Sequence, residues 1–115
     1  MRFEIYCKGF LIGHSELESG DPPMGVALGR FVPNAAYEAV RPDVLRSPQD
    51  QASLQLSVRF EDKNMPCAGI TITDYSKDLG PDGIEISVLG IPYPLYAEVF
   101  PDHVAAYDKQ FKRDS

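Results

Sequence analysis

The sequence predicts an α+β fold, a curved antiparallel sheet of about six strands with a short helix after the third strand and a C-terminal helix packed on one face. Several segments alternate apolar and polar residues, as half-buried strands do. Turns rich in Gly, Pro and Asp separate these segments, which favours antiparallel neighbours. The last segment repeats its apolar residues at the spacing of a helix. We therefore expect one globular domain over residues 1–115.

The expected strands of the first half occupy residues 2–7, 10–18 and 21–31, with a tight turn at residues 8–9. On the third strand, Gly25, Ala27 and Gly29 leave one face nearly bare, so another group should approach it closely. Packing by another part of the chain is one explanation, and a ligand groove is the other. The segments expected to pack there are the terminal helix or the rings of Tyr93, Tyr96 and Phe100.

The second half begins with a two-turn helix over residues 33–40, bounded by Pro33 and Pro42. A proline-punctuated surface loop follows over residues 41–51. Three strands over residues 54–60, 69–75 and 84–91 are expected to form a meander. A short helix over residues 92–100 and the terminal helix over residues 100–113 should follow.

Length and composition favour an ordinary globular protein, since 43% of its 115 residues are hydrophobic and 24% are charged. No apolar run approaches the roughly 20 residues that span a bilayer, and the N-terminus alternates from the start. We therefore expect a cytoplasmic protein without a membrane partner. Cys7 and Cys67 lack metal-ligand spacing and are expected to be buried, reduced thiols. No cofactor is expected.

The formal charge of −6 is concentrated late in the chain, because residues 74–108 contain seven acidic residues and a single basic residue, Lys77. A negative surface repels phosphate backbones, so no nucleic-acid partner is expected. Such a surface does suit a basic protein partner. The residues expected to bind it are Asp74, Asp78, Asp82 and Glu85.

The leading functional hypothesis is a small acidic cytoplasmic binding or inhibitory protein without catalysis. Toxin-neutralising immunity proteins offer an analogy of size and charge only, with no shared motif. A structural subunit of a larger assembly, with exposed Tyr residues and Pro-rich loops as its contact surface, is a further alternative. The motifs "GHSEL" and "DLGPDG" lack residues that a nucleophile elbow and a calcium loop require.

An enzyme domain that binds a metal or another ligand is the remaining alternative. On a regular strand His14, Glu16 and Glu18 share one face, where they could converge on a divalent ion. Exposing them while Phe10 and Ile12 are buried requires a bulge at Gly13. Arg30 is expected to form a salt bridge, with Glu16 or Glu18 as its acid. His103 is expected to be a surface or boundary residue.

Overall fold

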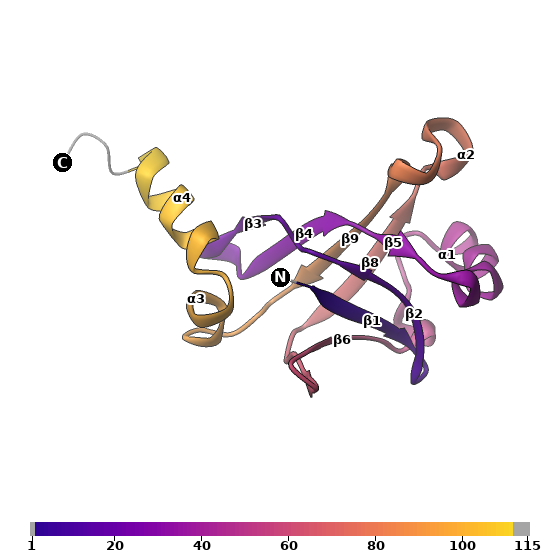
Figure 1. The fold of residues 1–115 in the computed structure, drawn as a ribbon, viewed down its shortest axis with the longest axis horizontal. Coiled ribbons are helices and arrows are strands. Elements are labelled where there is room, and N and C mark those ends of the chain that lie inside the picture. The colour runs from indigo at the N-terminus through magenta and orange to yellow at the C-terminus, as the bar shows by residue number, and fades with distance from the viewer. Residues whose placement is uncertain (1, 112–115) are drawn as a thin grey trace.

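A computed structural model describes residues 2–111, with side chains to residue 110, as an α+β arrangement of antiparallel sheets (Figure 1). A five-stranded sheet has the order β5-β2-β1-β6-β7, and a four-stranded sheet has the order β3-β4-β9-β8. The strands are β1 (Phe3–Cys7), β2 (Phe10–Ser15), β3 (Ser19–Asp21), β4 (Val26–Arg30), β5 (Val32–Pro33), β6 (Leu56–Phe60), β7 (Lys63–Asn64), β8 (Gly69–Asp74) and β9 (Ile84–Leu89). The α-helices are α1 (Arg41–Arg46), α2 (Ser76–Leu79), α3 (Leu95–Val99) and α4 (Pro101–Phe111). The 3-10 helices are η1 (Pro22–Met24), η2 (Ala35–Ala39), η3 (Ala52–Leu54) and η4 (Pro81–Gly83).

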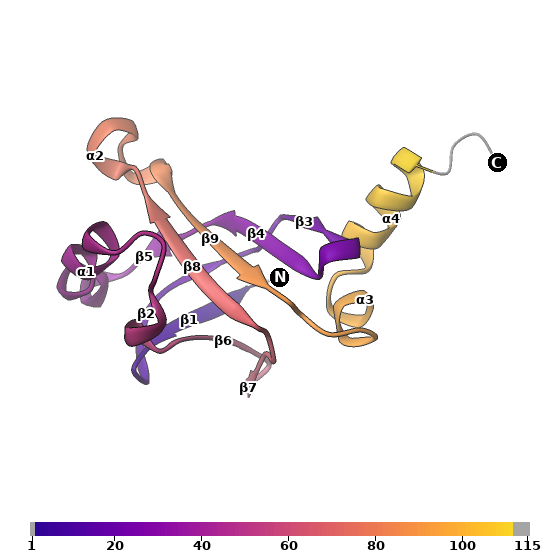
Figure 2. The same ribbon diagram turned by 180° about the vertical axis from the view of Figure 1, so that it is seen from behind.

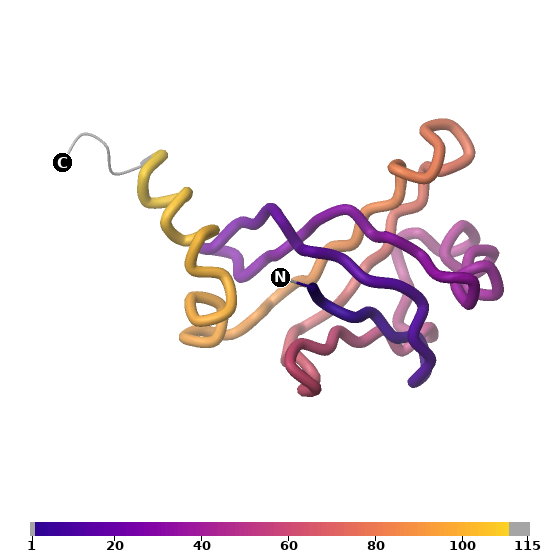
Figure 3. The backbone as a smooth tube through the Cα atoms, viewed as in Figure 1, coloured from indigo at the N-terminus to yellow at the C-terminus, as the bar shows by residue number. Residues whose placement is uncertain are grey.

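The α+β class is confirmed, but the single curved six-stranded sheet is wrong, because the strands form two sheets and neither closes. The two sheets are linked by one long bent hairpin, visible in Figure 3 as two neighbouring segments that run through both sheets. Near its base β2 pairs with β5, and toward its tip β3 pairs with β4. The bend falls at Leu17, which is fully buried at φ 44° and donates its N–H to Ser15 Oγ at 3.0 Å. The expected second strand therefore ends at Ser15 instead of continuing to Glu18.

The three-stranded meander is also wrong. β8 and β9 form the expected hairpin, but β6 pairs with β1 and β7 in the other sheet. Alternation fixes which face of a strand is buried, whereas the choice of partner depends on contacts far along the chain. Of the side chains that alternation placed inward on the strands expected at residues 54–60 and 69–75, Leu54, Val58 and Ile72 are buried, whereas Leu56, Phe60 and Ile70 are half-buried.

The two sheets bury one shared hydrophobic core between them. Ile5 and Val58 enter it from the five-stranded sheet, and Ile72 and Ile86 enter it from the four-stranded sheet. All four side chains are at most 1% exposed. Phe3 continues the core toward the C-terminal helices, where its ring stacks on Phe100 at a centroid distance of 5.3 Å.

The segment after β5 is more helical than its prolines suggested. The expected helix forms as the 3-10 helix η2. Asn34 caps its N-terminus, because the Asn34 side-chain oxygen accepts a hydrogen bond from the Ala36 N–H at 2.9 Å. The expected loop after it begins with α1. Pro42 does not stop a helix there, because it occupies the first turn of α1, where a missing N–H costs nothing.

The terminal helix forms over Pro101–Phe111, while the last two residues of its expected range, 112–113, lie outside the described residues. It does not lie across a sheet face. Its main contacts are with α3, β3 and η1, and Figures 1 and 2 show it extending away from both sheets. None of the helices within residues 2–111 has the length and apolar character needed to cross a bilayer.

The face that carries Gly25, Ala27 and Gly29 is packed against other parts of the chain, so packing explains these small residues better than a ligand groove does. A Cβ atom on Gly29 would lie 2.9 Å from the Glu18 amide nitrogen and still closer to the Glu18 carboxylate. At Gly25, with φ +65°, a Cβ atom would lie 2.7 Å from the Ile91 carbonyl oxygen. Of the expected neighbours, Tyr96, and His103 of the terminal helix, approach the same hairpin at Gly20, which pairs with Ala27. The space at Gly29 is therefore filled by Glu18.

We expect Gly29→Val to lower the free energy of unfolding by about 1–3 kcal/mol, because the backbone of Glu18 must move to admit a side chain. Gly69→Val is the matched control, since Gly69 belongs to β8 of the same sheet and a Cβ atom there meets nothing within 4 Å. Urea midpoints of the two variants measure the difference. Equal midpoints would mean that the Gly29 face is open.

Candidate functional site

The connection between β8 and β9 projects from the end of the hairpin (Figure 2). We call this connection, together with the first two residues of β9, the α2 tip (residues 75–85). Two large apolar side chains are exposed on it, Tyr75 at 59% and Leu79 at 68%. Three of the predicted binding residues, Asp78, Asp82 and Glu85, are exposed on the same segment. The α2 tip therefore combines exposed apolar side chains with exposed carboxylates.

A hollow of about 320 Å³ opens beside the α2 tip. Tyr75 and Leu79 line it on the side of the tip, together with the acids Asp82 and Glu85. Its lining is completed by residues of β3, β4, β8, η4 and their flanks: Glu18, Ser19, Gly29, Arg30, Thr73, Gly83 and Ile84. The hollow is shallow and open to solvent, so it suits a side chain of a partner better than an enclosed small molecule.

Arg30 reaches into this hollow from β4, and its predicted acid partner is corrected by the structure. Arg30 Nη2 lies 2.6 Å from Asp82 Oδ1, and the two side chains are 53% and 76% exposed. Glu18 binds the main chain instead, because its Oε2 accepts from the Arg30 backbone N–H at 2.9 Å. Asp82 thus already accepts a guanidinium group at the rim of the hollow.

Asp74, the fourth predicted binding residue, is not on this surface. Its side chain is 1% exposed and accepts hydrogen bonds from Tyr37 Oη at 2.6 Å and Arg41 Nη1 at 2.9 Å. The backbone N–H and the hydroxyl of Ser76 donate to its other oxygen. Asp74 is therefore a structural carboxylate whose side chain is not exposed for a partner to contact.

This buried network fastens the α2 tip to η2 and α1. Arg41 also donates to Ser76 Oγ, binds Glu38, and lies over the Tyr37 ring at 5.0 Å. Burial raises the pKa of the Asp74 carboxyl, but the bonds from Ser76 and Tyr37 and the charge of Arg41 outweigh it, so that this pKa lies below its ordinary value. Burial and the Asp74 carboxylate together raise the pKa of Tyr37. Asp74 is thus charged and Tyr37 neutral at physiological pH.

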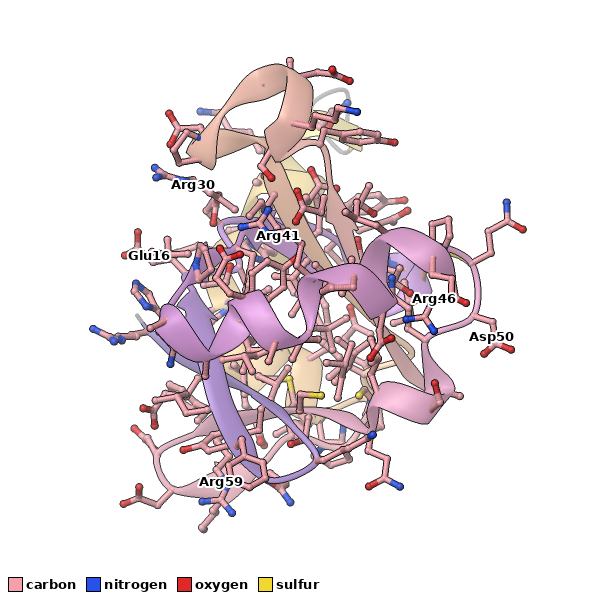
Figure 4. All side chains as sticks on the ribbon, turned by 90° about the vertical axis from the view of Figure 1, so that its right-hand side faces the viewer. Glu16, Arg30, Arg41, Arg46, Asp50 and Arg59 are labelled. Carbon is pink, nitrogen blue, oxygen red and sulfur yellow. The ribbon has the colours of Figure 1, made fainter. Side chains whose placement is uncertain are left out.

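The candidate metal residues lie beside a second hollow of about 470 Å³. It is lined by Arg2, His14, Glu16, Glu18, Arg30 and Val32. Figure 4 shows Glu16 and Arg30 on the same side of the molecule. No group of three His, Cys, Asp or Glu side chains within residues 2–111 is arranged to hold a metal ion. The structure therefore does not bring the predicted triad together as a metal centre.

The bulge that this strand needed is present, one residue from its expected place. The pairing of β1 with β2 shifts so that Tyr6 faces Leu11 while Ile5 faces Gly13, which leaves Ile12 as the extra residue. Ile12 is consequently buried while His14 stays half-exposed.

The second histidine is structural. His103 Nε2 lies 2.7 Å from the Leu17 carbonyl oxygen, so this nitrogen carries the proton. Tyr96 likewise donates its hydroxyl to the Val26 carbonyl at 2.7 Å, and burial raises the pKa of Tyr96 to about 12. The half-buried His103 agrees with the boundary position that the sequence indicated.

The two cysteines are free thiols. Cys7 is buried, as expected, and its thiol donates to the Leu54 carbonyl at 3.0 Å. Cys67, which was also expected to be buried, is only half-buried. Burial raises the pKa of both thiols. Neither thiol is therefore an activated nucleophile.

Sequence reasoning missed the apolar part of the α2 tip. Tyr75 and Leu79 stand in the turn "TDYSKDLGPDG", where an aromatic and a leucine among polar residues were a usable signal. No protein-family model matches the chain, and no curated protein sequence or solved structure is significantly similar to it.

Proposed function

We propose that the protein is a non-catalytic binding protein whose α2 tip receives a basic segment of a partner protein. One observation carries the proposal: the exposed Tyr75 and Leu79 line the same hollow as Asp82 and Glu85. Inhibition of the partner would follow from covering its basic surface. Free Cys7 and Cys67 favour the cytoplasm as the compartment of this activity.

The two chemical parts of the α2 tip contribute differently to such binding. The carboxylates attract a cationic partner over a distance and raise the association rate. The apolar side chains supply contact area once the partner has docked. Arg30 does not block the site, because an exposed ion pair is worth only about 0–1 kcal/mol and a partner's arginine can replace it on Asp82.

A labelled nona-arginine peptide tests the electrostatic part by fluorescence anisotropy. We expect the protein to bind it and to lose affinity as salt rises. The triple variant Asp78→Asn, Asp82→Asn and Glu85→Gln should bind at least about tenfold more weakly at low salt, with a shallower salt dependence. The charge-matched control is Glu61→Gln, Asp62→Asn and Glu98→Gln, three exposed acids away from the tip, and it should bind like the parent.

The apolar part is tested with the double variant Tyr75→Ser and Leu79→Ser. It should weaken binding of the same peptide without changing the slope of affinity against salt, because no charge is altered. If the two triple variants lost affinity equally, the peptide would be responding to net charge alone, and the α2 tip would not be the binding site.

A further inference from the structure

A second apolar surface lies at the turn between β1 and β2, beside η2 and α1 (Figure 1). Phe10 is 73% exposed there, the highest value among the large exposed apolar side chains of residues 2–110. Next to its ring is a hollow of about 390 Å³. The hollow is lined by Cys7, Lys8, Phe10, Ile12, Ala36, Ala39, Val40, Asp43 and Leu54.

The local backbone explains why the ring lies beside the hollow and leaves it open. Lys8 and Gly9 turn the chain with positive φ angles of 51° and 84°, so Phe10 emerges at the end of the hairpin. Across the hollow, η2 presents Ala36 and Ala39, whose methyl groups are too short to fill it. The surface therefore carries an apolar projection and an apolar recess side by side.

We propose that a second copy of this chain covers this surface in a two-fold symmetric dimer. Two-fold contacts require a self-complementary surface, on which each feature meets its complement in the other copy. Here the Phe10 ring of each copy enters the recess of the other between Ala36, Ala39 and Val40. A projection and a recess on the same small surface meet this requirement, whereas an unrelated partner would have to supply both.

The charges around the recess have the same complementarity. The hollow holds one base, Lys8, and one acid, Asp43. Both line the recess, and Asp43 also forms an exposed ion pair with Arg46 of α1. Lys8 precedes Phe10 in the same turn and lines the same hollow, so in the dimer each Lys8 approaches Asp43 of the other copy. Asp43 can accept this second base because its exposed pair with Arg46 is worth only about 0–1 kcal/mol, so an acid of one chain meets a base of the other.

The contact is small, and the dimer should be correspondingly weak. Two aromatic rings and the linings that receive them fall short of the roughly 1,200–2,000 Å² buried in standard stable interfaces. We therefore expect a dissociation constant of about 10–500 μM. Such a dimer would present two α2 tips to one partner.

Sedimentation equilibrium of the full chain between about 10 μM and 1 mM, a range chosen to bracket that affinity, tests the proposal. The weight-average mass should rise from 12.8 kDa toward twice that value. Phe10→Ser should remain monomeric throughout. Met24→Ser removes a side chain that is 68% exposed on η1, and it should dimerise like the parent.

A charge exchange makes the test specific. Lys8→Glu and Asp43→Lys should each weaken the dimer by at least about fivefold, and the double variant should recover most of the affinity, because the reversed charges again face each other. Urea midpoints confirm that each variant is folded. A parent protein that stays monomeric to 1 mM, or a Phe10→Ser variant that associates like the parent, would overturn the proposal.

Discussion

Asp74→Ala is expected to lower the free energy of unfolding by about 2–5 kcal/mol, because it leaves several buried donors without an acceptor. Tyr37 is fully buried, and its hydroxyl would lose its hydrogen bond to Asp74. The Ser76 amide and hydroxyl would lose their bonds to the same carboxylate. Arg41 would keep its ion pair with Glu38, and its side chain is 26% exposed, so its charge would not be left buried and unpaired. Urea denaturation measures the loss.

The matched control is Asp78→Ala, which removes an exposed carboxylate four residues along the same segment. Its effect should lie within about 0.5 kcal/mol of zero. Tyr37→Phe removes a single donor and should cost about 1 kcal/mol. If Asp74→Ala and Asp78→Ala were equally mild, the buried network would not stabilise the fold.

The same carboxylate predicts a pH dependence. The pKa of Asp74 is lower in the folded protein than in the unfolded chain, so its contribution is complete above the ordinary carboxyl pKa of about 4. That contribution is lost as the pH falls through the lower folded value. Asp74→Ala should therefore lose less stability than the parent between about pH 5 and pH 2.

Asp74 also shows what sequence could and could not predict about the candidate site. Asp74, Asp78, Asp82 and Glu85 are equivalent members of an acidic run when only their spacing is considered. Their difference arises because η2 and α1 pack beside β8 and bring Tyr37 and Arg41 to one carboxylate alone. Those donors stand more than thirty residues away, with no local signal that connects them to Asp74.

For the fold as well, local features could be predicted from the sequence, whereas long-range contacts could not. Alternation identified the longer strands and the buried face of β1, because side-chain direction is a local property. The division into two sheets depends on the bend at Leu17, a leucine in a left-handed conformation that glycine would normally occupy. Burial of Leu17 in the core stabilises this bend, and that contact is not visible in the sequence.

Gln51 illustrates the same limit, since it falls in a segment that the sequence indicated to be a surface loop, yet it is 6% exposed. Its side-chain amide forms two hydrogen bonds with the outer strand β8. Gln51 Nε2 donates to the Ile72 carbonyl at 2.7 Å, and the Ile72 N–H donates to Gln51 Oε1 at 2.8 Å. Among the described residues β8 pairs with β9 alone, so this amide takes the place of a neighbouring strand's peptide group.

Gln51→Leu should therefore lower the free energy of unfolding by about 2–6 kcal/mol, because it keeps the bulk but leaves two buried backbone groups of Ile72 unpaired. Gln51→Glu is the matched variant. It keeps an acceptor for the Ile72 N–H but sets a carboxylate oxygen against the Ile72 carbonyl, and its deficit relative to the parent should shrink as acid protonates that oxygen. Amide hydrogen exchange locates the effect: the Ile72 amide should exchange faster in Gln51→Leu by more than the amide of Ile86, its partner residue on β9. If the Ile72 amide exchanged in Gln51→Leu as slowly as in the parent, a group other than Gln51 would be accepting the hydrogen bond from the Ile72 N–H.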